Sequence, residues 1–284
     1  MGTVVLNTAY KSSLTGGTFA DSLTANSGDS LAVATFGVGE AKVLEAWAID
    51  SASVAELEWI YTRPDSTHDQ QHGVRFNIPA TALGGAGTNA AFNLLPGMTT
   101  IPLQRNDTAT LTVSGTSSDA FVMSWTTLYD DLPGAQGAVF IDWPTAQNLR
   151  KSTFGWACNA VASGTKGVYG AARALNADDD RFHGDTWYAI LGCTVQTPVT
   201  TIALLGPNFA GQRIGLPAGA LDLNSPTWFV EQSEKWGIPL IPCFQSSNKQ
   251  NTYAYVADQA ASTSPKIDFL AYELTTPMSQ VPGF

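Results

Sequence analysis

The sequence has few charged residues and no long apolar run. Only 13% of its 284 residues are Asp, Glu, Lys or Arg, whereas charged residues make up about 25% of a typical globular protein. No apolar stretch approaches the roughly 18–20 residues that a membrane-spanning helix requires, so we expect no transmembrane segment. The first residues also lack a basic segment followed by an apolar one. We therefore expect no signal peptide, and synthesis in the cytoplasm.

A cluster of positive charge is lacking as well. The chain has 14 Lys and Arg residues against 24 Asp and Glu residues, which gives a net charge of -10. The nearest approach to a basic patch is the pair Arg150 and Lys151. Proteins that bind nucleic acid present a clustered basic surface to the phosphates. We therefore expect no direct nucleic-acid binding.

Cysteine occurs only three times. Cys158, Cys193 and Cys243 are odd in number and far apart in the sequence. A disulfide framework in a small secreted protein shows an even number of cysteines at short spacings. We expect three free, buried thiols in a reducing compartment.

Aromatic residues, in contrast, are abundant and lie in short strand-like segments. Eight Trp, eight Tyr and thirteen Phe can supply a large buried core, which excludes a disordered chain. Segments rich in β-branched and aromatic residues alternate with Gly, Asn, Asp and Pro turns, a pattern typical of β-strands. The predicted strands are residues 30–36, 42–49, 56–62, 108–114, 121–128, 186–193, 200–205, 252–257 and 267–274. We expect helical or irregular connectors at residues 143–162 and 227–236.

The second half of the chain repeats features of the first half in the same order. Residues 75–83 recur as residues 213–221 with five of nine positions identical. Residues 97–102 recur as residues 237–242, and each half ends in an aromatic-rich strand that runs into a proline. The offset between the copies drifts slowly, as loop insertions would produce. This repeat predicts two related domains in tandem.

Two duplicated all-β halves in a chain of this length resemble the double jelly-roll major capsid proteins of tailless icosahedral phages and related viruses. The fold that we predict is all-β, with two tandem jelly-roll β-sandwich barrels and short helical connectors. The predicted divisions are an N-terminal arm (1–29), a first jelly roll (30–133), a connector (134–149), a second jelly roll (150–277) and a C-terminal tail (278–284).

The resemblance implies a structural virion protein that is not an enzyme and has no catalytic, cofactor-binding or metal-binding residues. Members of this family form trimers that tile an icosahedral shell, often over an internal membrane. The implied partners are therefore other copies of the chain in a homotrimer and a capsid lattice, penton or minor capsid proteins, and an internal membrane. Sparse charge agrees with this role, because the centres of protein interfaces are depleted of charged residues.

One alternative is a serine esterase of the GDSL/SGNH type. Gly28-Asp29-Ser30-Leu31 spells the motif that names this family, in which Ser30 would be the nucleophile and His183 the general base. Asp180 would orient His183, and Asn89 would contribute to an oxyanion hole. However, a polar segment precedes Ser30 and a strand-like segment follows it, whereas this nucleophile should follow a buried strand and open a helix. A turn is the simpler interpretation of the motif.

Two further alternatives concern metal and glycan binding. His68 and His72 are four residues apart near Asp65 and Asp69, but the surrounding sequence indicates a solvated hairpin tip. The run 176–180 spaces its oxygen atoms like a calcium loop but lacks the Gly and Glu of an EF-hand. A tandem β-sandwich spike or glycan-binding virion protein would need exposed aromatic residues. Trp143 and Trp156 are the candidates for such a platform.

Overall fold

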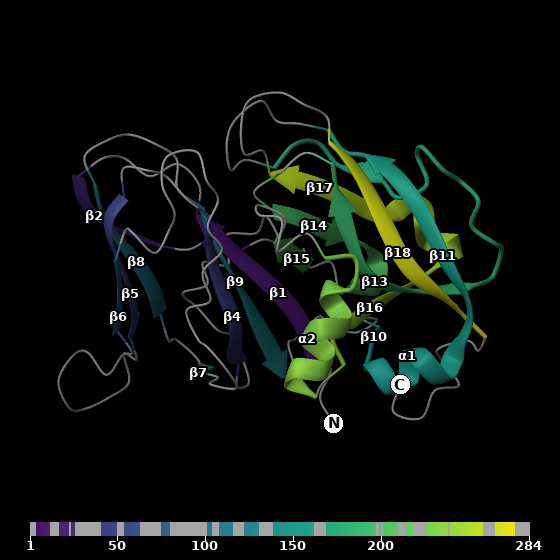
Figure 1. Ribbon diagram of the computed structural model, residues 1–284, viewed down its shortest axis with the longest axis horizontal. Helices are drawn as coiled ribbons and strands as arrows, with labels where there is room; N and C mark the ends of the chain where they lie inside the picture. The colour runs from purple at the N-terminus through teal and green to yellow at the C-terminus, as the bar shows by residue number, and fades with distance from the viewer. Residues whose placement is uncertain are drawn as a thin grey trace.

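The computed structural model places two pairs of antiparallel β-sheets along the chain (Figure 1). It describes residues 4–11, 17–22, 24–25, 41–49, 54–62, 75–79, 101–103, 108–115, 122–130, 139–161, 169–196, 199, 201–209, 214–217, 225–237, 239–257 and 265–275. Side chains are described only within residues 139–275. The described residues agree with the predicted all-β class, and none of their helices is long and apolar enough to cross a membrane.

The described residues of the first half form nine strands in two sheets. The strands are β1 (Val4–Lys11), β2 (Gly17–Ser22), β3 (Thr24–Ala25), β4 (Ala41–Ile49), β5 (Val54–Thr62), β6 (Arg75–Pro79), β7 (Ile101–Leu103), β8 (Thr108–Gly115) and β9 (Val122–Asp130). One sheet has the order β3-β1-β9-β4-β7 and the other has the order β2-β8-β5-β6. All of the pairings are antiparallel.

The described residues of the second half also form nine strands in two sheets. They are β10 (Phe140–Ile141), β11 (Arg150–Asn159), β12 (Arg173–Ala174), β13 (Trp187–Val195), β14 (Thr201–Leu205), β15 (Ile214–Pro217), β16 (Ile241–Gln245), β17 (Tyr253–Ala257) and β18 (Lys266–Leu274). The sheet orders are β10-β16-β13-β18-β11 and β12-β17-β14-β15. The helices are α1 (Trp143–Leu149) and α2 (Trp228–Trp236), with 3-10 turns η2 (Pro207–Phe209) and η4 (Ser246–Asn251).

The two halves connect equivalent strands in the same order. When β3 and β10 are set aside, eight described strands remain in each half. In each half the first strand pairs with the eighth, the eighth with the third and the third with the sixth. In the other sheet the second strand pairs with the seventh, the seventh with the fourth and the fourth with the fifth. The repeated sequence segments lie on equivalent strands, namely β6 and β15, β7 and β16, and β9 and β18.

A β-bulge occurs in the third strand of each half. The register of β4 against β9 shifts between Val43 and Glu45, so Leu44 is the extra residue. The register of β13 against β18 shifts between Ile190 and Gly192, so Leu191 is the extra residue. A bulge places two residues opposite one and bends the strand. When the sequences of β4 and β13 are aligned on their bulged residues, Leu44 corresponds to Leu191 and Glu45 corresponds to Gly192.

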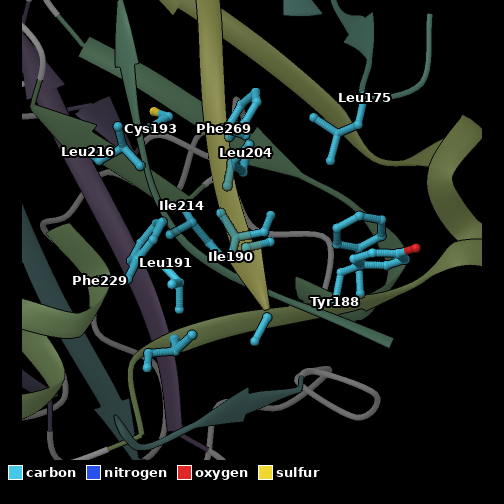
Figure 2. Packing of buried hydrophobic residues seen from close by; sticks show 14 of the residues in the cluster. Leu175, Tyr188, Ile190, Leu191, Cys193, Leu204, Ile214, Leu216, Phe229 and Phe269 are labelled. Atoms are coloured by element: carbon cyan, nitrogen blue, oxygen red, sulfur yellow. The ribbon is translucent and has the colours of Figure 1, made fainter. Parts of the chain in front are cut away.

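The core of the second half lies between its two sheets. Residues of β18 alternate along the strand between buried and half-buried positions up to Glu273, as the two-residue period of a strand requires. Figure 2 shows Ile190 on one sheet lying close to Leu204 and Ile214 on the other. These three side chains are completely buried, so the two sheets share one hydrophobic cluster.

Helix α2 covers the outer face of β13. The contacts of α2 with β13 and β16 bury Trp228 and Phe229, and Figure 2 shows Phe229 beside Leu191. The chain that enters α2 approaches β13 closely, because a Cβ atom added to Gly192 would lie 2.7 Å from the carbonyl carbon and oxygen of Pro226. The helix ends at Gly237, whose φ of 65° lies in the left-handed region that favours glycine.

The two halves lie side by side, with β1 next to β15 (Figure 1). The pairing of the first three strands bears on the predicted N-terminal arm. Strands β1, β2 and β3 fall within residues 1–29, which we predicted to be an arm outside both barrels. Each of these strands pairs with a neighbour in a sheet of the first half, and the hydrogen bonds of those pairings make the segment part of the sheets.

Most of the predicted strands agree with the structure. Eight of the nine overlap β4, β5, β8, β9, β13, β14, β17 and β18, and the segment 30–36 lies outside the described residues. The predicted connector 227–236 matches α2. The other predicted connector, 143–162, is α1 followed by the ten-residue strand β11.

Candidate functional site: a buried carboxylate and the outer edge of β11

The described residues of the predicted esterase site are not brought together. Ser30 and Asn89 lie outside the described residues. The Nδ1 atom of His183 lies 2.5 Å from Oε1 of Glu273 on β18. Asp180, the residue predicted to orient His183, instead forms an ion pair with Lys249. The acidic partner of His183 is therefore Glu273.

Glu273 is a buried carboxylate on the core-facing side of β18. It is 3% exposed, and Ser152 Oγ donates a hydrogen bond to its Oε2 atom at 2.6 Å. His183 binds the other oxygen, and Lys151 Nζ lies 4.0 Å away. Burial raises the pKa of Glu273, but the hydrogen bonds from Ser152 and His183 and the charges of His183 and Lys151 outweigh burial, so the pKa lies below its ordinary value. These partners hold the carboxylate in its ionised form.

The arrangement around Glu273 stabilises a charge and does not activate a nucleophile. A catalytic serine passes its proton to a neighbouring base. Here Ser152 and His183 bind opposite oxygens of one carboxylate, so the Ser152 hydroxyl donates to Glu273. Glu273 was not among the residues predicted from the sequence. The available signal was an acidic residue at a core-facing position of the alternating segment 266–274.

A cluster of aromatic rings surrounds Phe182, the residue before His183, and anchors the segment that follows β12. Phe182 is 7% exposed, and its ring centroid lies 5.1 Å from that of Phe154 and 5.2 Å from those of Trp156 and Tyr188. The Tyr188 hydroxyl accepts a hydrogen bond from the backbone N–H of His183 at 2.8 Å. Phe182 thus fixes the segment 178–183 against the core.

The side chains that precede Phe182 bind the backbone of β11 along its outer edge. The N–H of Asn159 donates to Asp178 at 2.8 Å, and the backbone of Ala157 contributes to lowering the pKa of Asp179. Arg181 Nη2 donates to the carbonyl oxygen of Gly155 at 3.0 Å. We call Asp178, Asp179 and Arg181 the edge clasp.

Ion pairs hold the edge clasp in position. Arg181 makes two hydrogen bonds to Asp179, at 2.7 and 2.5 Å, and Arg173 makes two to Asp178, at 3.1 and 2.5 Å. The hydrogen bonds from Arg173 lower the pKa of Asp178 to about 2. The hydrogen bonds from Arg181 likewise lower the pKa of Asp179. Both carboxylates are therefore ionised over the physiological pH range.

These pairings also bear on the metal-binding alternatives. Asp178, Asp179 and Asp180 each bind a different cation, namely Arg173, Arg181 and Lys249. Within the described ranges, no group of three or more His, Cys, Asp and Glu side chains could hold a metal ion. His68 and His72 lie outside those ranges.

The two tryptophans considered for a glycan platform contact the protein itself. Trp156 is 3% exposed and stacks on Phe269 with a centroid distance of 4.9 Å. Trp143 is half-buried and stacks on Tyr272 at 5.7 Å. Arg150 also lies over the Tyr272 ring, 5.3 Å from its centroid. Trp156 is thus a core residue, which excludes it as a saccharide platform.

The three cysteines are free and buried, as predicted. Burial, followed by the charge of Asp178, raises the pKa of Cys158 to about 12. Burial also raises the pKa of Cys193 and of Cys243. A thiol must ionise to act as a nucleophile, so these side chains serve as small apolar core residues.

No protein-family model matches the chain, and no curated protein matches it. Among solved structures, the chain is similar to one described as "Crystal Structure of the STIV MCP", with 10% identity over 100% of both chains and a TM-score of 0.23. It is also similar to "Crystal structure of PBSX exported protein XepA", with 12% identity over 95% of this chain and 86% of that chain and a TM-score of 0.23. Both TM-scores lie below 0.5, so these similarities carry no weight for fold or function.

Proposed function

We propose that the protein is a structural virion subunit, a double jelly-roll major capsid protein that assembles as trimers into an icosahedral shell. The observation that carries this proposal is the strand order, which occurs twice in one chain. A jelly roll pairs its eight strands as 1-8-3-6 in one sheet and 2-7-4-5 in the other. The equivalent strands of both halves follow these two orders.

The first proposed unit differs from the predicted one at its start. The first jelly roll would begin at β1 and end with β9, since β1 and β2 supply its first and second strands. The second would run from β11 to β18, within the predicted range 150–277. Strand β10 and helix α1 would form the connector. The C-terminal tail 278–284 stays a prediction, because it lies outside the described residues.

Composition supports an assembling protein over the other proteins that use this fold. Jelly rolls occur in viral capsids, in lectins and in cupins, so the fold alone does not decide the function. The 13% charged residues are expected of a subunit whose flanks are covered by neighbours. Neighbouring capsid subunits are the proposed partners, and we propose no enzymatic activity.

The test of the proposed function is the mass of the purified protein in solution, combined with electron microscopy in negative stain. We expect a species of three times the chain mass, and closed shells or lattice fragments at higher concentration. A monomer at every concentration would contradict the proposal. A glycan array separates the spike alternative, which predicts saccharide binding without shell formation.

A fluorophosphonate probe tests the esterase alternative independently of assembly. Such probes label a serine only where a neighbouring base activates its hydroxyl. We expect no labelling of Ser30, because the described partner of His183 is Glu273 and the described partner of Asp180 is Lys249. Labelling that is lost in Ser30→Ala would establish the esterase and refute the purely structural role.

A further inference from the structure

The edges of the sheets in the second half differ greatly in length. β10 and β12 each have two residues, and β15 has four residues and lies next to β1. β11 has ten residues, and among the described strands it pairs with β18 on one side only. A long edge strand presents unpaired N–H and C=O groups to which a strand of another molecule can add. β11 is therefore the edge of this half through which two copies of the chain could pair.

The edge clasp binds the backbone groups that such a strand would use. In an antiparallel pair, the N–H and C=O groups of alternate residues point to the same side. Gly155, Ala157 and Asn159 are alternate residues. The clasp binds an outward group of Gly155 and of Asn159, and the backbone of Ala157 between them contributes to lowering the pKa of Asp179. The side chains therefore occupy the place of a neighbouring strand along this part of β11.

In the first half, a short strand pairs with the equivalent edge through backbone hydrogen bonds. β1 is the equivalent of β11, and β3 pairs with it on its outer side at Ala9 and Tyr10. β3 lies in the connection between the second and third strands, β2 and β4. The edge clasp lies in the equivalent connection, between β12 and β13. The outer edge of the first strand can thus accept a strand in this architecture, and in the second half three side chains take that place.

The remaining part of β11 carries two other features that discourage pairing. The register against β18 shifts between Arg150 and Ser152, and a bulge interrupts the regular ladder. Lys151 in this bulge is exposed, and an exposed lysine opposes the addition of a strand. Between the bulge and the residues next to the clasp, Thr153 is the one residue whose N–H and C=O groups point to the outer side of β11. No partner of its N–H lies among the described residues.

We propose that the edge clasp guards β11 against sheet-to-sheet pairing with the β11 edge of a second copy of the chain. Self-association would then proceed through other surfaces. The two β11 strands could pair antiparallel about a two-fold axis once the clasp is removed, since the same residues would meet on both copies. This inference goes beyond the proposed function, because it concerns an association that the native chain avoids.

The test compares two double variants of the full chain by sedimentation velocity over a concentration series. Asp179→Ala with Arg181→Ala removes two members of the clasp. Asp180→Ala with Lys249→Ala removes the neighbouring ion pair, which does not bind β11, with the same change in charge. We expect the first variant to form species larger than those of the wild type at equal concentration, and the second to match the wild type. If the two variants show the same distribution of particle sizes, the proposal is overturned, whether or not the wild type forms shells.

A proline in β11 tests whether the new association uses this edge. Ala157→Pro removes an outward N–H without removing a hydrogen bond to β18, and proline is tolerated on edge strands. Added to the clasp variant, it should return the size distribution to that of the wild type. Larger species that persist with the proline would overturn the proposal.

Amide hydrogen exchange tests the guard in the unaltered protein, so the proposal does not depend on the folding of any variant. The Asn159 amide donates to the Asp178 carboxylate, whereas the Thr153 amide points to the same side without a described partner. A hydrogen bond to a charged group should slow exchange at Asn159 by about 10- to 100-fold relative to Thr153, after correction for intrinsic rates. Exchange at Asn159 as fast as at Thr153 would overturn the proposal.

Discussion

The two halves of the chain connect eight equivalent strands in the same order, yet they differ in the groups that surround those strands. At the bulge of the third strand, the first half has Glu45 where the second half has Gly192. With the bulges aligned, Tyr129 of β9 corresponds to the buried Glu273 of β18. In the second half, helix α1 and strand β10 also precede β11. The difference teaches that strand order can persist while the sheet edges and the residues at equivalent positions change.

The largest effect is expected from Phe182, whose ring anchors the edge clasp in the second half. Phe182→Ala should destabilise the protein by about 4 kcal/mol, because it removes a buried ring that contacts Phe154, Trp156 and Tyr188. Urea unfolding followed by tryptophan fluorescence measures the change. Phe182→Leu, which keeps most of the apolar volume, is the control and should lose clearly less. If the alanine variant unfolds at the wild-type urea concentration, Phe182 does not anchor the segment.

The position after the bulge provides a direct comparison of the halves. Gly192→Ala should cost about 2–3 kcal/mol, because its Cβ would lie 2.7–2.8 Å from backbone atoms of Ser225 and Pro226. Gly184→Ala is the matched control, since its Cβ would meet nothing within 4 Å. Chemical unfolding of both variants tests the difference. Equal midpoints would mean that the close approach to α2 does not determine the residue after the bulge.

The buried carboxylate predicts an acid sensitivity specific to the second half. The pKa of Glu273 is lower in the folded protein than its ordinary value of 4.5. Its contribution to stability is therefore present above about pH 4.5 and is lost as the pH falls through the folded pKa. Glu273→Gln should cost about 2 kcal/mol at pH 7 and reduce this loss on acidification.

Unfolding curves at several pH values measure this effect. Glu234→Gln serves as the control, because Glu234 is exposed on α2 and should leave the acid limb unchanged. An identical acid limb in Glu273→Gln and in the wild type would show that Glu273 is not the group responsible.

A smaller effect is expected in the connector between the halves. Asp142 caps α1 by accepting a hydrogen bond from the backbone N–H of Thr145 at 2.9 Å. Asp142→Ala should destabilise the second half by about 1 kcal/mol, whereas Asp142→Asn should cost less because asparagine also caps helices. Thermal unfolding measured by circular dichroism distinguishes the two. Equal losses in both variants would assign the effect to charge and not to capping.

The sequence revealed those parts of the fold that depend on alternation and repetition. The aromatic strand 267–274 was predicted within one residue of β18 because its apolar residues alternate. The strand β11 was not predicted, although its apolar residues Phe154, Trp156 and Cys158 also occur at every second position. The preceding segment 143–149 reads as a connector, and Gly155 interrupts the pattern of strand-forming residues.

The polar contacts were harder to predict because they join distant parts of the chain. His183 and Glu273 are 90 residues apart, and Ser152 and Glu273 are 121 apart. A local motif suggested Asp180 as the partner of His183. The fold instead brings β18 beside His183, and only the strand pairing determines that contact.

The bulges at Leu44 and Leu191 limit which insertions and deletions each half can accept. Side chains alternate between the two faces of a strand, so Tyr188 and Ile190 share the core-facing side with Cys193 and Val195 only because the bulge takes up one extra residue. Deleting Leu191 would keep these residues on one face but would remove the bulge and the bend that it produces. Inserting a further residue would turn one flank of β13 to the opposite face. Single substitutions meet no such constraint on length, which agrees with two halves that share a skeleton but little sequence.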